Sequence, residues 1–275
     1  MNDLSFNQIP LFIPHSSTST KVNQTGSWRF FHPKFVEKTA PCSAACPLGQ
    51  DIARIEMLTS RGQFQDAWQT ILNENPFPAI CGRVCFHPCE NACNRTAMDE
   101  PIAIHHLERF LGDTALLDDS QTDFNIKPAK GKKVSIAGAG PAGLAAAFFL
   151  RRLGYGCDMF EARSEPGGLL RWGIPAYRLP RDILDKEIRR VKDLGVTIHC
   201  KMPVTENLLE KICREYEALF VACGYYMSKT QKNKKKKKEN EWQEKLRNTK
   251  HKKKTTKGIK AAIVGGENTE NQVQR

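Results

Sequence analysis

The chain has 275 residues, of which 40 % are hydrophobic, enough for two modest domains with ordinary cores. Its formal net charge of +12 comes from the segment 227–260, in which 15 basic residues stand against 3 glutamates. The other residues carry 27 basic and 27 acidic side chains, so the folded part is expected to be neutral, which argues against a nucleic-acid-binding domain.

The first 33 residues are rich in Ser, Thr and Asn and show no sustained hydrophobic period. We expect a mobile leader over 1–33. It lacks the basic region and the long apolar core of a secretory signal, so we expect a cytoplasmic protein. In that reducing compartment, cysteines favour metal binding over disulfides.

Six of the ten cysteines lie in CSAACP, beginning at residue 42, and in CGRVCFHPCENAC, beginning at residue 81. Within each group, neighbouring cysteines are four residues apart. Because Pro88 breaks any continuous helix, the thiols are expected on tight turns and short helical pieces. Apolar periodicity predicts helices over 51–59, 63–72 and 102–116.

Thiolates at this spacing, with a proline directly after Cys46, are typical of iron–sulfur sites, because soft sulfur ligands suit the Fe–S core. Structural zinc takes four thiolates at similar spacings, and residue types alone leave it open. A cluster beside a flavin fold would form a redox chain, so we favour iron–sulfur. We interpret His87, His105 and His106 as surface or capping residues. The four later cysteines, which lie in apolar patterns, are interpreted as core residues: Cys157, Cys200, Cys213 and Cys223.

The stretch 134–161 has the order strand, G-x-G-x-x-G, helix, strand and terminal acid. This is the dinucleotide-binding fingerprint. Gly138 permits the tight turn, Gly140 lets a diphosphate approach the backbone, and Gly143 lets the helix pack on its strand. The helix N-terminus attracts phosphate, and Glu161 can accept the ribose hydroxyls. A membrane span over this apolar run is disfavoured by its glycines, its proline and the Arg151–Arg152 pair that follows.

Further elements of an α/β domain follow the fingerprint. The pattern predicts a helix over 183–194, a strand over 196–200, a helix over 208–216 and a buried strand over 218–223. The segment 226–259 is Lys-rich, of low complexity and expected to be disordered. Trp242 is its only large aromatic residue, so it lacks the interleaved aromatics of a single-strand nucleic-acid binder.

The motifs together resemble the small subunit of NADPH-dependent glutamate synthase, and the N-terminal module of dihydropyrimidine dehydrogenase is similar. The stretches that carry the resemblance include APCSAACP, ENPFPAICGRVCFHPCENACNR, DEPIAIHHLERF, GAGPAG and FEARSEPGGLLRWGIPAYRLP. It covers about residues 25–224. It implies a multidomain α plus α/β fold, with a helical iron–sulfur domain followed by an incomplete Rossmann-like FAD-binding domain.

The resemblance also implies metal ligands. Cys46, Cys85 and Cys89 fall on three ligand positions of one [4Fe–4S] cluster, and Glu108 falls on its fourth, which is a glutamine in dihydropyrimidine dehydrogenase. Cys42 and Cys93 fall on ligands of a second cluster. The other two cysteines of that cluster would lie near residues 34 and 37, where this chain has Lys34 and Glu37. We therefore expect one cluster, in which Cys42 or Cys93 could replace Glu108, and a core role for Cys81.

For the α/β domain the resemblance implies FAD. The residues implied to contact it are Gly138, Gly140, Pro141, Ala142, Gly143, Leu144, Glu161, Gly168, Leu169, Arg178 and Val204. The last stretch, 260–275, resembles the start of a second glycine motif, for NADPH. Its second and third glycine positions hold Glu267 and Glu270, which would block and repel the phosphates, so we expect no NADPH binding by this chain alone.

These observations predict six parts: a leader (1–33), an iron–sulfur domain (34–118), a linker (119–130), a partial FAD domain (131–225), the Lys-rich segment (226–259) and a remnant of an NAD(P)H motif (260–275). The predicted function is an iron–sulfur flavoprotein module of an NAD(P)H-dependent oxidoreductase that relays electrons between FAD and a [4Fe–4S] cluster to a partner subunit or domain. The alternatives are a non-catalytic electron-transfer or scaffold fragment, and a zinc protein with a nucleic-acid-binding tail. No side chain is expected to act as acid or base, and no membrane partner is expected.

Overall fold

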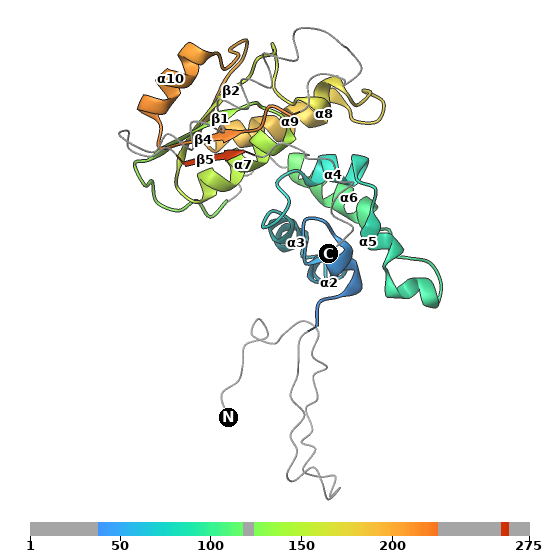
Figure 1. The fold of residues 1–275 in the computed structure, drawn as a ribbon. Coiled ribbons are helices and arrows are strands. Elements are labelled where there is room, and N and C mark those ends of the chain that lie inside the picture. Colours follow the sequence, from blue (N-terminus) through green and yellow to red (C-terminus); the bar gives the residue numbers. More distant parts are fainter. Residues whose placement is uncertain (1–37, 118–123, 225–259, 264–275) are drawn as a thin grey trace, which may run out of the picture. The chain divides into compact units, whose positions relative to one another are not determined.

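The computed structural model describes residues 38–117, 124–224 and the backbone of 260–263 (Figure 1). The chain divides into two compact units, 1–117 and 118–275, and each is described by itself. The predictions for the leader, for the Lys-rich segment and for the second glycine motif beyond residue 263 concern residues outside the described ranges. In the described part of the chain, no helix is both long and apolar enough to cross a membrane.

The first unit is helical, as its sequence predicts. Its elements are α1 (Pro41–Ala45), α2 (Ile52–Ser60), α3 (Phe64–Ile71), α4 (Pro78–Val84), α5 (Pro88–Asn91), the 3₁₀ turn η4 (Asn94–Ala97) and α6 (Ile104–Leu117). One core cluster consists of Ile55, Leu58, Ala67, Ile71 and Leu111, which come from α2, α3 and α6. The periodic apolar faces of these three helices therefore meet, as an amphipathic pattern requires.

Helices α4 and α6 pack at unusually close range. A Cβ on Gly82 would lie 2.5 Å from the backbone nitrogen of Arg109, and one on Gly112 would lie 2.5 Å from that of Ala79. Since only glycine lacks a Cβ, these two positions let the helix backbones touch. The contact brings α4, which carries Cys81, close to α6, which carries Glu108.

Prolines begin the short helical pieces that carry the cysteines. Pro41, Pro78 and Pro88 each stand in the first turn of a helix, where a missing N–H costs nothing. Cys46 follows the end of α1, and Cys85 follows the end of α4. The predicted interruption at Pro88 is confirmed, because α4 and α5 are separate helices: Cys81 lies in α4, Cys85 lies between the two helices and Cys89 lies in α5.

The second unit is a parallel five-stranded sheet with the order β3-β2-β1-β4-β5. Its elements are β1 (Lys133–Ala137), α7 (Pro141–Arg152), β2 (Gly156–Phe160), α8 (Leu169–Trp172), α9 (Arg181–Asp193), β3 (Val196–His199), α10 (Glu206–Glu215), β4 (Ala218–Val221) and β5 (Lys260–Ile263). Ser135 pairs with Asp158 on one side and with Leu219 on the other. Helices α7 and α9 cover one face and α10 the other, as right-handed crossovers demand (Figure 1). All carboxyl ends therefore lie at one edge of the sheet.

Two expectations differ from the structure. Within the predicted linker, Lys127 and Lys130 donate backbone hydrogen bonds to the carbonyls of Arg152 and Gly154, so this stretch packs on the end of α7. Cys157 is buried and Cys200 and Cys213 are half-buried, but Cys223 is exposed. Cys223 is not a core residue, because it follows the end of β4 at Val221; its Sγ lies 3.5 Å from the carbonyl oxygen of Ala137, the last residue of β1.

Candidate cofactor sites

The helical unit contains a cavity of about 260 Å³. Cys46, Cys85 and Cys89 all line it, although they come from three separate turns of the chain. Apolar side chains make up much of the remaining wall, among them Leu48, Ile52, Ile55, Ile71, Val84, Ile104 and Leu107. The structure thus brings together the three cysteines that the resemblance assigns to one cluster.

The three thiols are close enough to influence one another. Burial, together with the nearby Cys46 and Cys85, raises the pKa of the Cys89 thiol to about 12. The backbone N–H of His87 donates to Cys85 Sγ over 3.4 Å. Thiolates gathered in an apolar wall repel one another, so a cation among them would relieve that repulsion.

The cavity suits an inorganic cluster better than an organic cofactor. It is smaller than the roughly 300–1,000 Å³ of pockets for organic ligands, and its donor set is soft sulfur. Glu56 Oε1 also faces this region; it is buried, and within the described residues no hydrogen-bond partner reaches it. A buried polar atom without a partner is rare in a native protein, which fits a site completed by a bound group.

Glu108, the fourth residue of the implied ligand set, lies in the wall of the same cavity. Its Oε1 accepts hydrogen bonds from Gln50 Nε2 at 3.0 Å and from Asn75 Nδ2 at 2.6 Å. Burial raises the pKa of the Glu108 carboxyl, and these two bonds oppose the rise. Cys81 also lines the cavity, so it is not simply a core residue.

Cys42 and Cys93 do not line this cavity. Cys42 packs on the cluster of Ile52, Cys89 and Ile104, and burial raises the pKa of its thiol. Cys93 caps η4.

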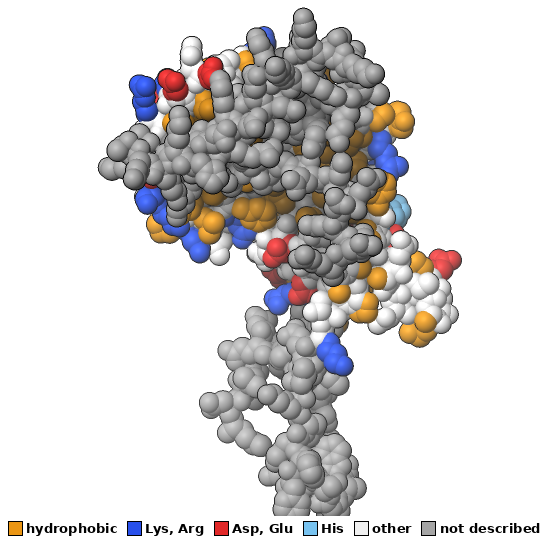
Figure 2. Space-filling model, in the orientation of Figure 1, with side chains coloured by type: hydrophobic (Ala, Val, Ile, Leu, Met, Phe, Trp, Pro, Cys, Tyr) orange, Lys and Arg blue, Asp and Glu red, His pale blue; other side chains and the backbone are white. Residues whose placement is uncertain are grey.

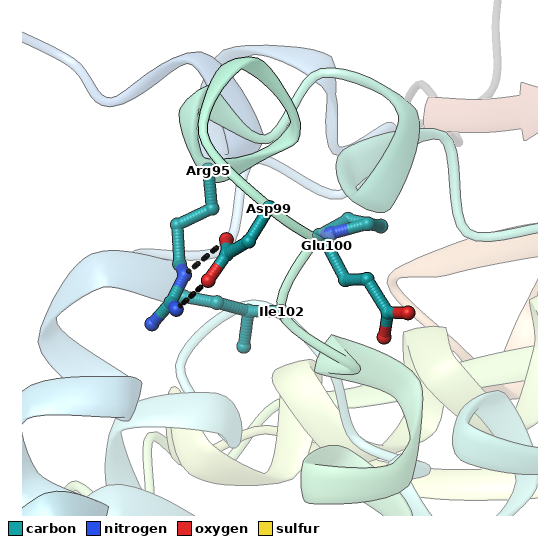
Figure 3. A pocket seen from close by; sticks show the side chains of 5 residues that line it. Arg95, Asp99, Glu100 and Ile102 are labelled. Atoms are coloured by element: carbon teal, nitrogen blue, oxygen red, sulfur yellow. Dashed lines mark hydrogen bonds and ion pairs between the residues drawn. The ribbon is translucent and has the colours of Figure 1, made fainter.

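Beyond η4 lies a shallow pocket of about 500 Å³, lined by Arg95, Asp99, Glu100, Pro101 and Ile102 (Figure 3). In it the exposed Arg95 Nε donates to Asp99 Oδ1 at 3.0 Å, and Glu100 points away from this pair. An exposed ion pair of this kind contributes little to stability.

The histidines lie closer to the site than the sequence suggested. His87 and His105 line the thiol cavity and stack with ring centroids 4.0 Å apart. Glu90 Oε1 accepts the backbone N–H of His105 at 2.9 Å and lies 2.6 Å from its Nδ1. Burial works to raise the pKa of Glu90, but the bonds from His105 hold it below its ordinary value. Glu90 therefore caps the first turn of α6 and ties α5 to it.

In the Rossmann-like unit the glycines of the turn have distinct tasks. Gly138 has φ +103°, and a Cβ there would meet the carbonyl oxygen of Ala222 at 2.4 Å. A Cβ on Gly143 would lie 2.0 Å from the carbonyl oxygen of Gly138. A Cβ on Gly140, however, would meet nothing nearer than Gly168 Cα at 3.8 Å. Gly140 thus borders open space beside the N-terminus of α7, where a diphosphate would fit.

The N-terminus of α7 has no side-chain cap. Pro141 occupies its first position, and the backbone N–H of Leu144 bonds to Gly140. Because the N–H groups of a helix's first turn lack intrahelical partners, those of Ala142 and Gly143 can serve an anion.

Glu161 is buried at the end of β2, as the fingerprint requires. Its Oε2 accepts the backbone N–H of Ala139 at 2.8 Å, and its Oε1 accepts that of Arg163 at 2.9 Å. A carboxylate has about four acceptor positions, so two remain for ribose hydroxyls. Glu161 therefore also fixes the turn, a task that sequence reasoning missed.

A second loop completes this region. The backbone N–H of Gly167 donates to Ala139 at 2.7 Å, and Gly168 has φ +52° and lies against Gly140. Leu169 is 67 % exposed, and Arg178 is exposed too. Val204 packs against the cluster that contains Ala137, Phe160 and Val221, so it lies beside the strand ends. The structure places all these residues in the Rossmann-like unit, and Gly168 directly against the turn.

Two family models match the chain in the order of its two units. Residues 36–119 match dihydropyrimidine dehydrogenase domain II, 4Fe–4S cluster. Residues 136–210 match the NAD(P)-binding Rossmann-like domain. The predicted fold, helical iron–sulfur domain first and Rossmann-like domain second, is confirmed.

Several curated relatives are similar over both units. The NADPH-Fe(3+) oxidoreductase subunit beta of Geobacter sulfurreducens is 38 % identical over 200 residues, which cover 71 % of this chain and 30 % of the relative. The NADP(+)-dependent formate dehydrogenase subunit beta of Moorella thermoacetica is 39 % identical over 212 residues, 69 % of this chain and 30 % of the relative. The dihydropyrimidine dehydrogenase subunit PreT of Escherichia coli is 40 % identical over 191 residues, 67 % of this chain and 45 % of the relative.

The chain spans less than half the length of these relatives. All three are named as subunits of oxidoreductases or dehydrogenases. The resemblance seen in the sequence is therefore confirmed: the chain carries, in order, a match to a 4Fe–4S cluster domain and a match to an NAD(P)-binding Rossmann-like domain, and it is similar to these relatives across both.

Proposed function

We propose that the chain is the cofactor-holding module of an NAD(P)H-dependent oxidoreductase, with FAD in the Rossmann-like unit and one [4Fe–4S] cluster in the helical unit. The observation that carries the proposal is the convergence of Cys46, Cys85 and Cys89 on one apolar cavity, in a chain that also has a dinucleotide turn. When bound, FAD exchanges hydride for single electrons, and the cluster carries one electron at a time.

In the Rossmann-like unit, the backbone would hold the flavin nucleotide. The N–H groups of Ala142 and Gly143 would bind its diphosphate at the N-terminus of α7, next to the space that Gly140 leaves open. Glu161 would accept hydrogen bonds from the ribose hydroxyls while it holds Ala139 in place. The exposed Leu169 and Arg178 of the second loop would cover and pair with the bound nucleotide.

In the helical unit, side chains would hold the cluster. Cys46, Cys85 and Cys89 would bind as thiolates, and the carboxylate of Glu108 would take the fourth place. The N–H of His87 would remain bonded to Cys85 Sγ, since hydrogen bonds to ligand sulfur tune reduction potential. The apolar wall would exclude water.

An electron-accepting partner subunit or domain would dock near the loop that joins Cys85 to Cys89. Phe86 in this loop is 97 % exposed, and Figure 2 shows hydrophobic side chains at the surface of the helical unit among charged ones. An exposed aromatic residue beside a ligand cysteine would give a partner an apolar anchor close to the cluster.

The test is anaerobic purification of the full chain, with measurement of iron, acid-labile sulfide and FAD per chain and of the visible spectrum. The proposal expects bound FAD together with equal amounts of iron and sulfide. The iron and the acid-labile sulfide should both fall in a Cys85→Ser, Cys89→Ser variant, whereas the matched Cys213→Ser change, in α10, should leave both unchanged. Zinc without sulfide would refute the cluster, and a chain that binds no FAD would refute the flavin site.

An assay of NADPH oxidation with a dye as electron acceptor distinguishes a cofactor-holding module from an enzyme that is active by itself. We expect no turnover by this chain alone, and reduction of its flavin by dithionite.

A further inference from the structure

The helical unit offers more than one side chain as the fourth ligand beside the three thiols. Glu108, Cys81 and Glu56 all line the cavity. Cys81 lies on α4 and Glu108 on α6, the two helices whose backbones touch at Gly82 and Gly112. Because both residues reach the same cavity, proximity alone does not decide between a thiolate and a carboxylate.

Asn75 lies between these two candidates and is 1 % exposed. The orientation of its side-chain amide follows from its contacts: the backbone N–H of Phe77 donates to Oδ1 at 2.9 Å, so the carbonyl end must face Phe77. The amide nitrogen then points to Glu108 Oε1, 2.6 Å away. The buried Gln50 donates to the same oxygen at 3.0 Å.

Both ends of Asn75 are thus engaged. Its nitrogen gives Glu108 a hydrogen bond of the kind that stabilises a carboxylate, and with Gln50 it occupies one oxygen of that carboxylate. The other end meets the rival donor, since Cys81 Sγ lies 3.6 Å from Asn75 Oδ1 and donates to it. One amide therefore holds the carboxylate in the wall and turns the S–H of Cys81 away from it.

We propose that Asn75, supported by Gln50, is the positioning residue that selects Glu108 instead of Cys81 as the fourth ligand of the cluster. The selection rests on the proposed function, because it presupposes a cluster in this cavity. Glu108 keeps its second oxygen for iron. Cys81 stays outside the ligand set, although a soft thiolate suits the iron–sulfur core better than a carboxylate does.

The substitution Asn75→Asp tests this selection directly. It preserves size and the acceptor for Phe77 and Cys81, but replaces the donor that faces Glu108 with a like charge. Cys81→Ala, the double variant Asn75→Asp/Cys81→Ala, and Glu56→Gln complete the set. Glu56→Gln tests the third candidate, because it alters a carboxylate of the same cavity whose Oε1 accepts no hydrogen bond from the described residues. The readouts are iron per full chain and the electron paramagnetic resonance spectrum of oxidised and dithionite-reduced protein.

The wild type, Cys81→Ala and Glu56→Gln should share one spectrum and a full iron content. Asn75→Asp should show a shifted spectrum of the reduced cluster as Cys81 takes the fourth place. The double variant should lose iron and show the oxidised-state signal of a three-iron cluster. Thermal unfolding of Asn75→Asp followed by circular dichroism checks that it is folded. If Asn75→Asp does not fold, the double variant Gln50→Leu/Cys81→Ala is measured in its place. It should contain less iron than Cys81→Ala alone.

Two results would overturn the selection. In one, Cys81→Ala or Glu56→Gln by itself changes the spectrum, which would make that residue a ligand. In the other, Asn75→Asp leaves the wild-type spectrum unchanged. Failure of the proposed function looks different, because the wild type itself would then contain no iron and sulfide.

Discussion

In the helical unit, side chains from the turns after α1 and α4 and from α2, α5 and α6 form the wall of the cavity. In the Rossmann-like unit, backbone N–H groups at the start of α7 and one carboxylate form the site. The first unit consists of short helices around that cavity, whereas the second has a continuous parallel sheet beneath its site. The proposed cluster would thus be part of the core of the helical unit. The proposed flavin nucleotide would bind at the edge of the sheet in the Rossmann-like unit.

This difference predicts opposite responses to loss of the cofactors. If the proposed cluster is present, removing its iron would leave the thiols of Cys46, Cys85 and Cys89 around an empty cavity inside the first unit. Removing the flavin would return backbone N–H groups to water and leave the sheet intact.

The largest effect is therefore expected when iron is removed with a chelator. Amide protection in α2, α4 and α6 should fall by about 100-fold, equivalent to about 2.7 kcal/mol, because metal binding stabilises only the folded unit. Hydrogen exchange with mass spectrometry of the loaded and stripped chain measures this loss. Peptides from β1 and α7 are the internal control and should keep their protection. An equal loss of amide protection in both units would contradict the proposed difference between them.

The next prediction separates glycines that serve the fold from the glycine that serves the ligand. Gly143→Ala should lower the free energy of unfolding of the Rossmann-like unit by about 1–3 kcal/mol, because the new methyl group would lie 2.0 Å from the Gly138 carbonyl oxygen. Gly140→Ala should change it by less than about 0.5 kcal/mol, since its Cβ enters open space, but should weaken FAD binding at least tenfold. Urea unfolding and flavin titration measure the two effects. Equal stability of both variants would contradict the assignment.

The sequence predicts those features of the structure that depend on residues adjacent in the chain. The turn at Gly138 and the break at Pro88 follow from local steric rules, and both are found as expected. The bonds of Gln50 and Asn75 to Glu108 span 58 and 33 residues, and no local spacing signals them. The available sequence signal was limited to two amide side chains, Gln50 and Asn75, close to the two cysteine groups. Cys223 was misjudged because its pattern continues the strand, while the sheet stops at Val221.

A smaller effect is expected at Glu161, the carboxylate that we propose binds the ribose hydroxyls of FAD. Glu161→Gln should weaken FAD binding about tenfold, about 1.4 kcal/mol, because a neutral amide accepts hydrogen bonds less strongly and turns its NH₂ toward one backbone N–H. The control is Glu165→Gln, since Glu165 is exposed on the same loop and pairs with Arg171. Isothermal titration with FAD measures both variants. If Glu165→Gln weakened binding as much, a general loss of negative charge would explain the result.

The smallest effect concerns Cys157 in β2, which is 3 % exposed. Burial raises the pKa of this thiol from 9.0 to about 11; Arg151 opposes the rise and Asp158 adds to it. The folded state therefore holds the thiol proton more tightly than the unfolded state does. The stabilisation is complete below pH 9 and is lost as the pH rises from 9 through 11, by an amount on the order of 1 kcal/mol.

The measurement is urea unfolding of the Rossmann-like unit within the full chain at pH 8 and pH 10.5, for the wild type and for Cys157→Ala. Other groups titrate in this range as well, so the informative quantity is the difference between the two pH-dependent losses. The wild type should lose about 1 kcal/mol more than Cys157→Ala, because only the wild type has to release the buried thiol proton. Equal losses would mean that the thiolate is solvated in the folded sheet. The core beneath the flavin site would then be more open to water than the buried β2 implies, and the contrast between the two units would weaken.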